Sequence, residues 1–209
     1  MAIREDEIVA GVYAGRDLIL EEAEVLERSE MIQEGVMLIL KALGVDLEDR
    51  NFADTPERYA RFIENMFWQD SPTISTFRED HDQMVIMRAH ECWTLCPHHL
   101  LPVRFEMAAA YIPGGSVLGV SKLARLFDDI NRVPLMQETA TDILCERLFK
   151  FTGRMGAGVV MRGEHLCMKM RGIKSQADIV TSKLMGVMRD NPQARQEFLQ
   201  FVAHPLTRS

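Results

Sequence analysis

The order of apolar patterns along the chain predicts an α+β fold built on an antiparallel sheet. Helical patterns come first, and two strands, two helices, two further strands and a last helix follow. The chain has 209 residues, of which 47% are hydrophobic, so it is long enough to bury one substantial core. We therefore expect an N-terminal helical region over residues 1–70 and a sheet-containing domain over residues 71–209, joined as one structural unit.

The N-terminal region contains two helical patterns. Residues 17–43 carry apolar residues at helical spacing with acids between them, which indicates one long amphipathic helix or two short ones. Residues 54–57 (DTPE) are typical of a helix start, because a capping side chain precedes a proline in the first turn. A helix over residues 56–67 places Arg58 and Arg61 on one face.

The rest of the chain alternates between strand and helix patterns. Ser121 is the expected cap of an amphipathic helix of sequence KLARLFDDI. In chain order, the expected elements are strands over 83–95 and 103–112, helices over 122–130 and 137–151, strands over 157–162 and 165–171, and a helix from 190–192 to 201.

The composition argues against two classes of protein. A net charge of −7 does not suit a general nucleic-acid coat, which needs a basic face, although a few convergent basic side chains could still hold an anionic substrate. No apolar stretch approaches the roughly 18 to 20 residues that span a bilayer, and the charged N-terminus is unlike a signal peptide. We therefore expect a cytoplasmic protein whose four cysteines are free thiols.

The segment Cys96-Pro97-His98-His99 is the first candidate for chemistry. A thiolate and an imidazole three positions apart can reach one metal ion if the backbone turns, and Pro97 favours a turn. Sulfur and nitrogen together are the ligand set that zinc prefers. A site with three protein ligands would keep a fourth position for water, whose pKa the metal lowers towards neutrality.

A second pair of candidate ligands follows at His165 and Cys167. In a strand, residues two apart share a face, so both side chains would point into one site. Four ligands would make a closed structural site, whereas three ligands and a free histidine would suit catalysis, and the spacing is compatible with both. The other two cysteines, Cys92 and Cys145, are expected to be structural.

Several basic residues could converge on an anionic group, because arginine and lysine in a pocket commonly hold phosphate or carboxylate. They are Lys122, Arg125 and Arg171, with Arg58 and Arg61 upstream. Glu138 follows Gln137 at an expected helix start, and its carboxylate could accept two N–H bonds, as from the edge of a guanine.

Taken together, these segments resemble the GTP cyclohydrolase I family of the zinc-dependent, folate-pathway type. The resemblance extends over residues 17–203, and several separate motifs occur in the family's order. The matching segments are CPHHLLPV (96–103), LGVSKLAR (118–125), QE (137–138), HLCMKMRG (165–172), DTPERYARF (54–62) and FLQFV (198–202).

The resemblance implies a tunnelling fold (T-fold), in which an antiparallel sheet carries helices on one face. It also implies toroidal homo-oligomers, usually decamers, with active sites between subunits. By match of motif, the Zn²⁺ ligands would be Cys96, His99 and Cys167. The same match leaves His98 and His165 free for proton transfer.

The resemblance also implies which residues bind the substrate. Glu138 would bind the guanine edge, assisted by the backbone of Gln137. The triphosphate would be held by Ser121, Lys122, Arg125 and Arg171, with Arg58 and Arg61 assisting from the helical region. The reaction would be zinc-dependent hydrolysis of GTP to 7,8-dihydroneopterin triphosphate and formate, the first step of tetrahydrofolate and pterin synthesis.

The sequence departs from the family pattern in three places. Pro97 stands where the family usually carries an acid, Pro134 interrupts its Arg-X-Gln pattern, and the loop after Arg171 is one residue shorter. One alternative is therefore a diverged cyclohydrolase of the same fold that serves 7-deazapurine synthesis, including queuosine-type nucleosides. Another is an inactive, zinc-stabilised assembly subunit, against which the intact His98, His165 and Glu138 argue.

Overall fold

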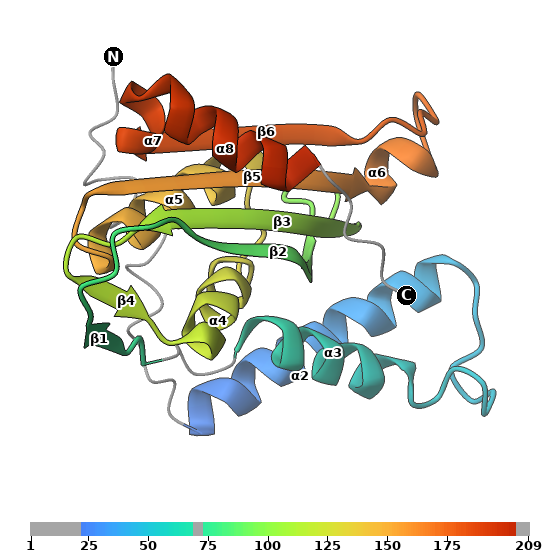
Figure 1. The fold of residues 1–209 in the computed structure, drawn as a ribbon. Coiled ribbons are helices and arrows are strands. Elements are labelled where there is room, and N and C mark those ends of the chain that lie inside the picture. The colour runs from blue at the N-terminus through green and yellow to red at the C-terminus, as the bar shows by residue number, and fades with distance from the viewer. Residues whose placement is uncertain (1–21, 69–72, 204–209) are drawn as a thin grey trace, which may run out of the picture. The chain divides into compact units, whose positions relative to one another are not determined.

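The computed structural model describes residues 22–68 and 73–203, and the chain divides into two compact units, residues 1–71 and 72–209 (Figure 1). The first few residues of the helix expected over 17–43 lie outside the described part. Every helix in the described ranges is too short or too polar to cross a membrane.

The N-terminal unit contains two helices, α2 (Glu22–Ala42) and α3 (Thr55–Phe67), which pack against each other. Ala60 on α3 is fully buried. Asp54 stands at the N-cap position of α3, but its carboxylate accepts a hydrogen bond from Arg58 at 2.8 Å and makes no side-chain bond to the helix end. The i, i+4 ion pair therefore takes the place of the cap.

The C-terminal unit is built on a four-stranded antiparallel sheet in the order β2-β3-β5-β6 (Figure 1). Its strands are β2 (Val85–Leu95), β3 (Pro102–Ile112), β5 (Gly156–His165) and β6 (Ile179–Gly186). A separate two-stranded sheet pairs β1 (Thr76–Arg78) with β4 (Ser116–Leu118). The sequence pattern missed β1, β4 and β6.

Two helices cover one face of the four-stranded sheet. These are α4 (Val120–Ile130) and α5 (Gln137–Phe151), and α5 packs on β5 and β6. Alternate strand residues such as Phe105, Met107 and Met161 are completely buried on this face, as the period of two in a strand requires. This side contains most of the core, and it confirms the expected α+β class with helices against an antiparallel sheet.

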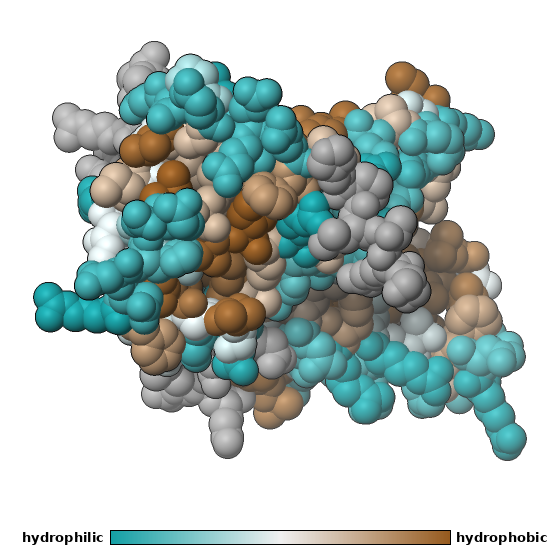
Figure 2. Space-filling model, viewed as in Figure 1, coloured by the Kyte–Doolittle hydropathy of each residue, from teal (hydrophilic) through white to brown (hydrophobic). Residues whose placement is uncertain are grey.

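The opposite face is covered in part by the C-terminal helices α7 (Val187–Asp190) and α8 (Pro192–Ala203). Phe198 and Met188 pack there with Ala110. Gly158 is required beneath them, because a Cβ at this position would come within 2.8 Å of Leu184 and Met188. Figure 2 shows hydrophobic surface that remains visible on this face beside the polar outer side of α8.

The structure corrects two local expectations. The helix α4 begins at Val120 after an N-cap at Gly119, so Ser121 is its second residue and does not cap it. The segment 165–171 is not a strand: β5 ends at His165, and the next four residues form the short helix α6 (Leu166–Lys169). The Cys167 side chain is therefore directed by a helical turn rather than by strand alternation.

Candidate metal and active site

The turn between β2 and β3 is closed by its own backbone. The amide N–H of Leu100 donates to the Cys96 carbonyl at 2.8 Å, and the N–H of Cys96 donates to the Leu101 carbonyl at 2.8 Å. Leu100 takes a left-handed φ of 52°, which lets the chain reverse within a few residues. The turn brings the sulfur of Cys96 and the ring of His99 to the same side.

Cys96, His99 and Cys167 form a group whose ligand atoms all lie within 4.8 Å of one another. The Cys96 Sγ and His99 Nδ1 atoms are 3.7 Å apart. Tetrahedral zinc with its usual bond lengths needs ligand atoms about 3.5 to 3.8 Å apart, so this donor set fits such an ion. Among the described residues this is the one group of three such side chains that could hold a metal.

The thiols of this group lie close enough to affect each other. Burial raises the pKa of the Cys167 thiol, and the neighbouring Cys96 raises it further, while the positive charge of Arg171 opposes the shift. A metal ion reverses this preference, because thiols bind as thiolates and give up their protons to do so. Metal binding by this group would therefore release the thiol protons.

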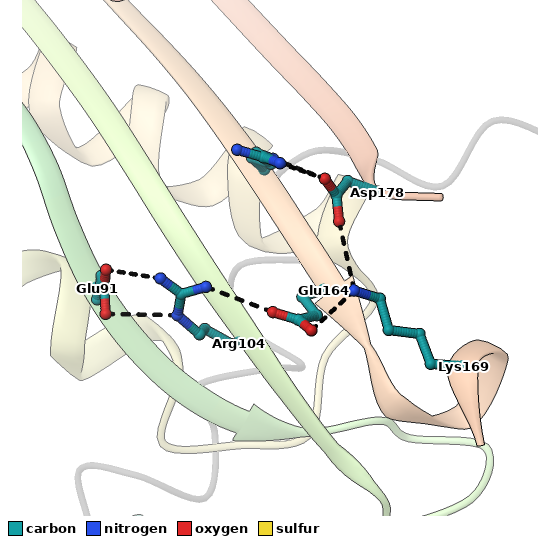
Figure 3. Close-up of polar contacts among 6 residues, drawn as sticks. Glu91, Arg104, Glu164, Lys169 and Asp178 are labelled. Carbon is teal, nitrogen blue, oxygen red and sulfur yellow. Dashed lines mark hydrogen bonds and ion pairs between the residues drawn. The ribbon is translucent and has the colours of Figure 1, made fainter. Parts of the chain in front are cut away.

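The helix α6 is attached to the sheet by charged side chains (Figure 3). Lys169, which is 18% exposed, contacts Glu164 at 2.7 Å and Asp178 at 3.8 Å. Glu164 also accepts from Arg104 at 3.3 Å, and Arg104 pairs with Glu91 at 2.7 Å. Ion pairs thus hold the turn that carries Cys167 to β5 and to the residue just before β6, and Glu164 extends the network to Arg104 on β3.

His165 lies half-buried beside the metal-binding group. The ring of Phe105 meets it edge-on with centroids 6.1 Å apart, and its Nε2 donates to Oε1 of Gln137 at 2.8 Å. Burial lowers the pKa of His165, and the negative charge of Glu138 acts in the opposite direction. The carboxylate of Glu138 is therefore close enough to His165 to favour the protonated form of its ring.

His98 is exposed and is not part of the metal-binding group. Its Nδ1 is 3.9 Å from the Cys96 sulfur, and its ring centroid is 6.3 Å from that of His99. Cys92 and Cys145 are buried outside the group, and burial raises the pKa of the Cys145 thiol to about 12.

The expected substrate-binding residues occupy three places. Ser121, Lys122 and Arg125 lie together in the first half of α4, while Arg171 follows α6 and Glu138 is exposed in the first turn of α5. No hydrogen bond in the described chain ties the three α4 side chains to the metal-binding group.

Two further expected residues, Arg58 and Arg61, belong to the N-terminal unit. Both are exposed on α3, where they pair with Asp54 at 2.8 Å and with Glu57 at 3.6 Å.

The sequence predicts a role for Gln137 only through its backbone, in binding guanine. In the structure the residue is 3% exposed, and its side chain is turned towards His165. Lys169, which anchors α6, had been given no role. Its location beside Cys167 in the sequence was the available signal, but its two acidic partners became neighbours only on folding.

Two cysteines and one histidine form a group that could hold a metal ion, and three protein ligands would leave a position open for a reactant. The family follows from comparison with known proteins. The chain belongs to the GTP cyclohydrolase I family, whose model matches residues 32–203.

Curated relatives agree over most of the chain. The GTP cyclohydrolase 1 of Alkalilimnicola ehrlichii is 38% identical over 184 residues, covering 85% of this chain and 100% of that protein. That of Hahella chejuensis is 37% identical and covers 78% of this chain and 91% of its own. The GTP cyclohydrolase 1 1 of Pseudomonas aeruginosa is 39% identical, with coverages of 78% and 92%.

Among solved structures, an archaeosine synthase QueF-like protein in its apo form aligns with a TM-score of 0.42 and 16% identity. The match covers 49% of this chain and 93% of that one.

Proposed function

We propose that this protein is a GTP cyclohydrolase I that hydrolyses GTP to 7,8-dihydroneopterin triphosphate and formate. The observation that carries the proposal is the Cys96–His99–Cys167 group, whose ligand atoms lie within 4.8 Å beside a half-buried histidine. Family membership supports the same activity.

The metal that best suits these three residues is Zn²⁺, because two thiolates and an imidazole are its preferred donors. The chemistry that zinc supplies in such a site is Lewis-acid activation of water for attack on an electrophilic carbon. This donor set also leaves His98 and His165 outside the coordination sphere.

Proton transfer would then fall to the two histidines that do not bind metal. His165, held between Phe105 and Gln137, is the residue proposed to protonate N7 of guanine, which makes C8 more electrophilic. His98 lies next to His99 at the solvent side and would serve the later proton transfers. Ring opening, release of C8 as formate and rearrangement of the ribose would complete the reaction.

Different residues would bind the guanine and the triphosphate of GTP. The exposed carboxylate of Glu138 would accept hydrogen bonds from the guanine edge, with the Gln137 backbone beside it. The triphosphate would be held by the Ser121, Lys122, Arg125 and Arg171 side chains, with help from Arg58 and Arg61 of the helical unit.

We also propose a homo-oligomeric ring, a decamer by family analogy, with active sites between subunits. In the described sheet, β2 and β6 are edge strands with one open side each, and open edges favour pairing with another chain. Four free thiols support the expected cytoplasmic location.

The test is a GTP turnover assay on zinc-loaded protein, following formate release and the dihydropterin absorbance. We expect product from the wild type and a loss of about 10²-fold or more in kcat for His165→Ala, because general acid–base groups contribute about that much. Zinc-loaded wild type that binds GTP and releases no formate would contradict the proposal.

A further inference from the structure

The side chain of Gln137 is buried and surrounded by hydrogen-bonding groups. Its Nε2 is 3.0 Å from the Met161 carbonyl, 3.0 Å from the Ile179 carbonyl and 3.1 Å from the Thr181 hydroxyl. Carbonyl oxygens only accept hydrogen bonds, so the NH₂ group must face β5 and β6. The amide oxygen Oε1 is therefore the atom that faces His165.

Neighbouring hydroxyl groups support this orientation. Thr141 donates its single hydrogen to the Gln137 carbonyl at 2.7 Å, so in the 2.6 Å contact between the two hydroxyls Thr181 must be the donor. The Thr181 oxygen is then free to accept from the Gln137 amide. The two hydrogens of the Gln137 amide thus face three acceptors, and none of these contacts requires the amide to be reversed.

The orientation of the Gln137 amide determines which ring nitrogen of His165 carries the hydrogen. Because Oε1 can only accept, the ring nitrogen 2.8 Å away must be an N–H donor, which leaves Nδ1 as the nitrogen that is free for other partners. Gly163 leaves room for this contact: a Cβ there would lie 2.1 Å from Oε1 and 2.8 Å from the His165 Nε2.

We propose that the Gln137 side chain is a positioning residue that fixes the ring plane of His165 and keeps the hydrogen on Nε2, so that Nδ1 exchanges the proton with the substrate. The inference rests on the proposed function, because it takes His165 as the proton-transfer group. It assigns to the Gln137 side chain a role different from guanine binding, which its 3% exposure prevents.

The test compares zinc-loaded wild type with Gln137→Met, His165→Ala and the double variant, in steady-state turnover over a range of GTP concentrations. Methionine keeps the length of glutamine and removes the acceptor. We expect Gln137→Met to lose about 10²-fold in kcat with unchanged KM for GTP and unchanged zinc content. In the His165→Ala background the same change should cost less than about threefold, because residues that act through one another are not additive.

A matched control is Thr152→Val, which removes one buried hydrogen bond, to the Leu148 carbonyl at 2.8 Å, near the far end of α5. It should lower thermal stability while kcat stays within about twofold of wild type.

The outcomes separate the two claims. Equal activity of His165→Ala and wild type would overturn the proposed role of His165 itself. A normal loss in His165→Ala, combined with an undiminished kcat in Gln137→Met, would overturn only the positioning role. So would a multiplicative loss in the double variant, or a fall in zinc content that accounts for the lower activity of Gln137→Met.

Discussion

The two segments that supply the metal-binding group are held in different ways. The turn that carries Cys96 and His99 is closed by backbone hydrogen bonds between residues at most five positions apart. The helix α6, which carries Cys167, depends on side chains, since Lys169 reaches Glu164 on β5 and Asp178 just before β6. One half of the site is thus local in origin, and the other exists only when the sheet has formed.

The largest effect is expected when a metal ligand is removed, whether it lies in the turn or on α6. Cys96→Ala and Cys167→Ala should each remove bound zinc and lower kcat by at least about 10³-fold, because several kcal/mol of transition-state stabilisation depend on the metal. Metal analysis and turnover measure both. Cys92→Ala, which alters a buried thiol outside the group, is the control and should keep its zinc. Normal zinc content in Cys96→Ala would exclude the group as proposed.

The next effect should appear only in the part of the site that α6 contributes. Lys169→Met should weaken zinc binding by about 10- to 100-fold, because residues that orient metal ligands commonly contribute that much. Competition with a chelator gives the affinity. Arg104→Met is the matched control: it removes the pairs with Glu91 and Glu164 but leaves both acidic partners of Lys169 in place. Equal zinc affinity in the two variants would mean that the ion pairs do not position α6.

A smaller effect should appear with acid. Lys169 lowers the pKa of Glu164 below its usual 4.5, and Arg162 is the main cause that lowers the pKa of Asp178 below 3.8. Groups with a depressed folded-state pKa stabilise the protein above the unfolded pKa and lose that contribution as the pH falls through the folded one. The stability difference between wild type and Lys169→Met should therefore shrink below about pH 4. Thermal melts from pH 7 to pH 3 measure it, and a constant difference would contradict the assignment.

The smallest effect is expected in the turn that carries Cys96 and His99. Pro97→Ala should change zinc affinity by less than about threefold and lower stability by about 0.5 to 1 kcal/mol, since proline acts mainly by restricting the unfolded chain. The backbone bonds of the turn do not involve the Pro97 side chain. A loss of zinc comparable to that of Lys169→Met would show that the turn, too, needs a stiff residue.

Much of the fold could be predicted from the sequence where the signal was local. The helix expected over 137–151 was observed as α5 (Gln137–Phe151), and the strands expected over 83–95 and 103–112 differ from β2 and β3 by two residues or fewer. Their apolar periodicity reports the face that each buries. The family resemblance, based on the same segments, was confirmed by the family model.

The missed elements have weak local signals. The three-residue strands β1 and β4 are too short to show a period. In β6 the apolar Val180 is exposed while the polar Thr181 and Lys183 are partly buried, so the strand lacks a clear apolar period and its pairing with β5 determines that it is a strand. The segment after His165 alternates like a strand in sequence. In the structure β5 ends at His165, and the next four residues form α6.

From the sequence by itself came the candidate metal ligands, the turn at residues 96–99 and the family. Spacing left three or four ligands open, and the family resemblance selected Cys96, His99 and Cys167. Only the tertiary structure decided the direction of Cys167 and the orientation of the Gln137 amide. Both depend on partners contributed by β5 and β6, such as Asp178 near Lys169 and Ile179 near Gln137. The physical reason is that Asp178 and Ile179 reach these positions only when β6 pairs with β5, and Ile179 is 42 residues from Gln137, a separation that no local pattern records.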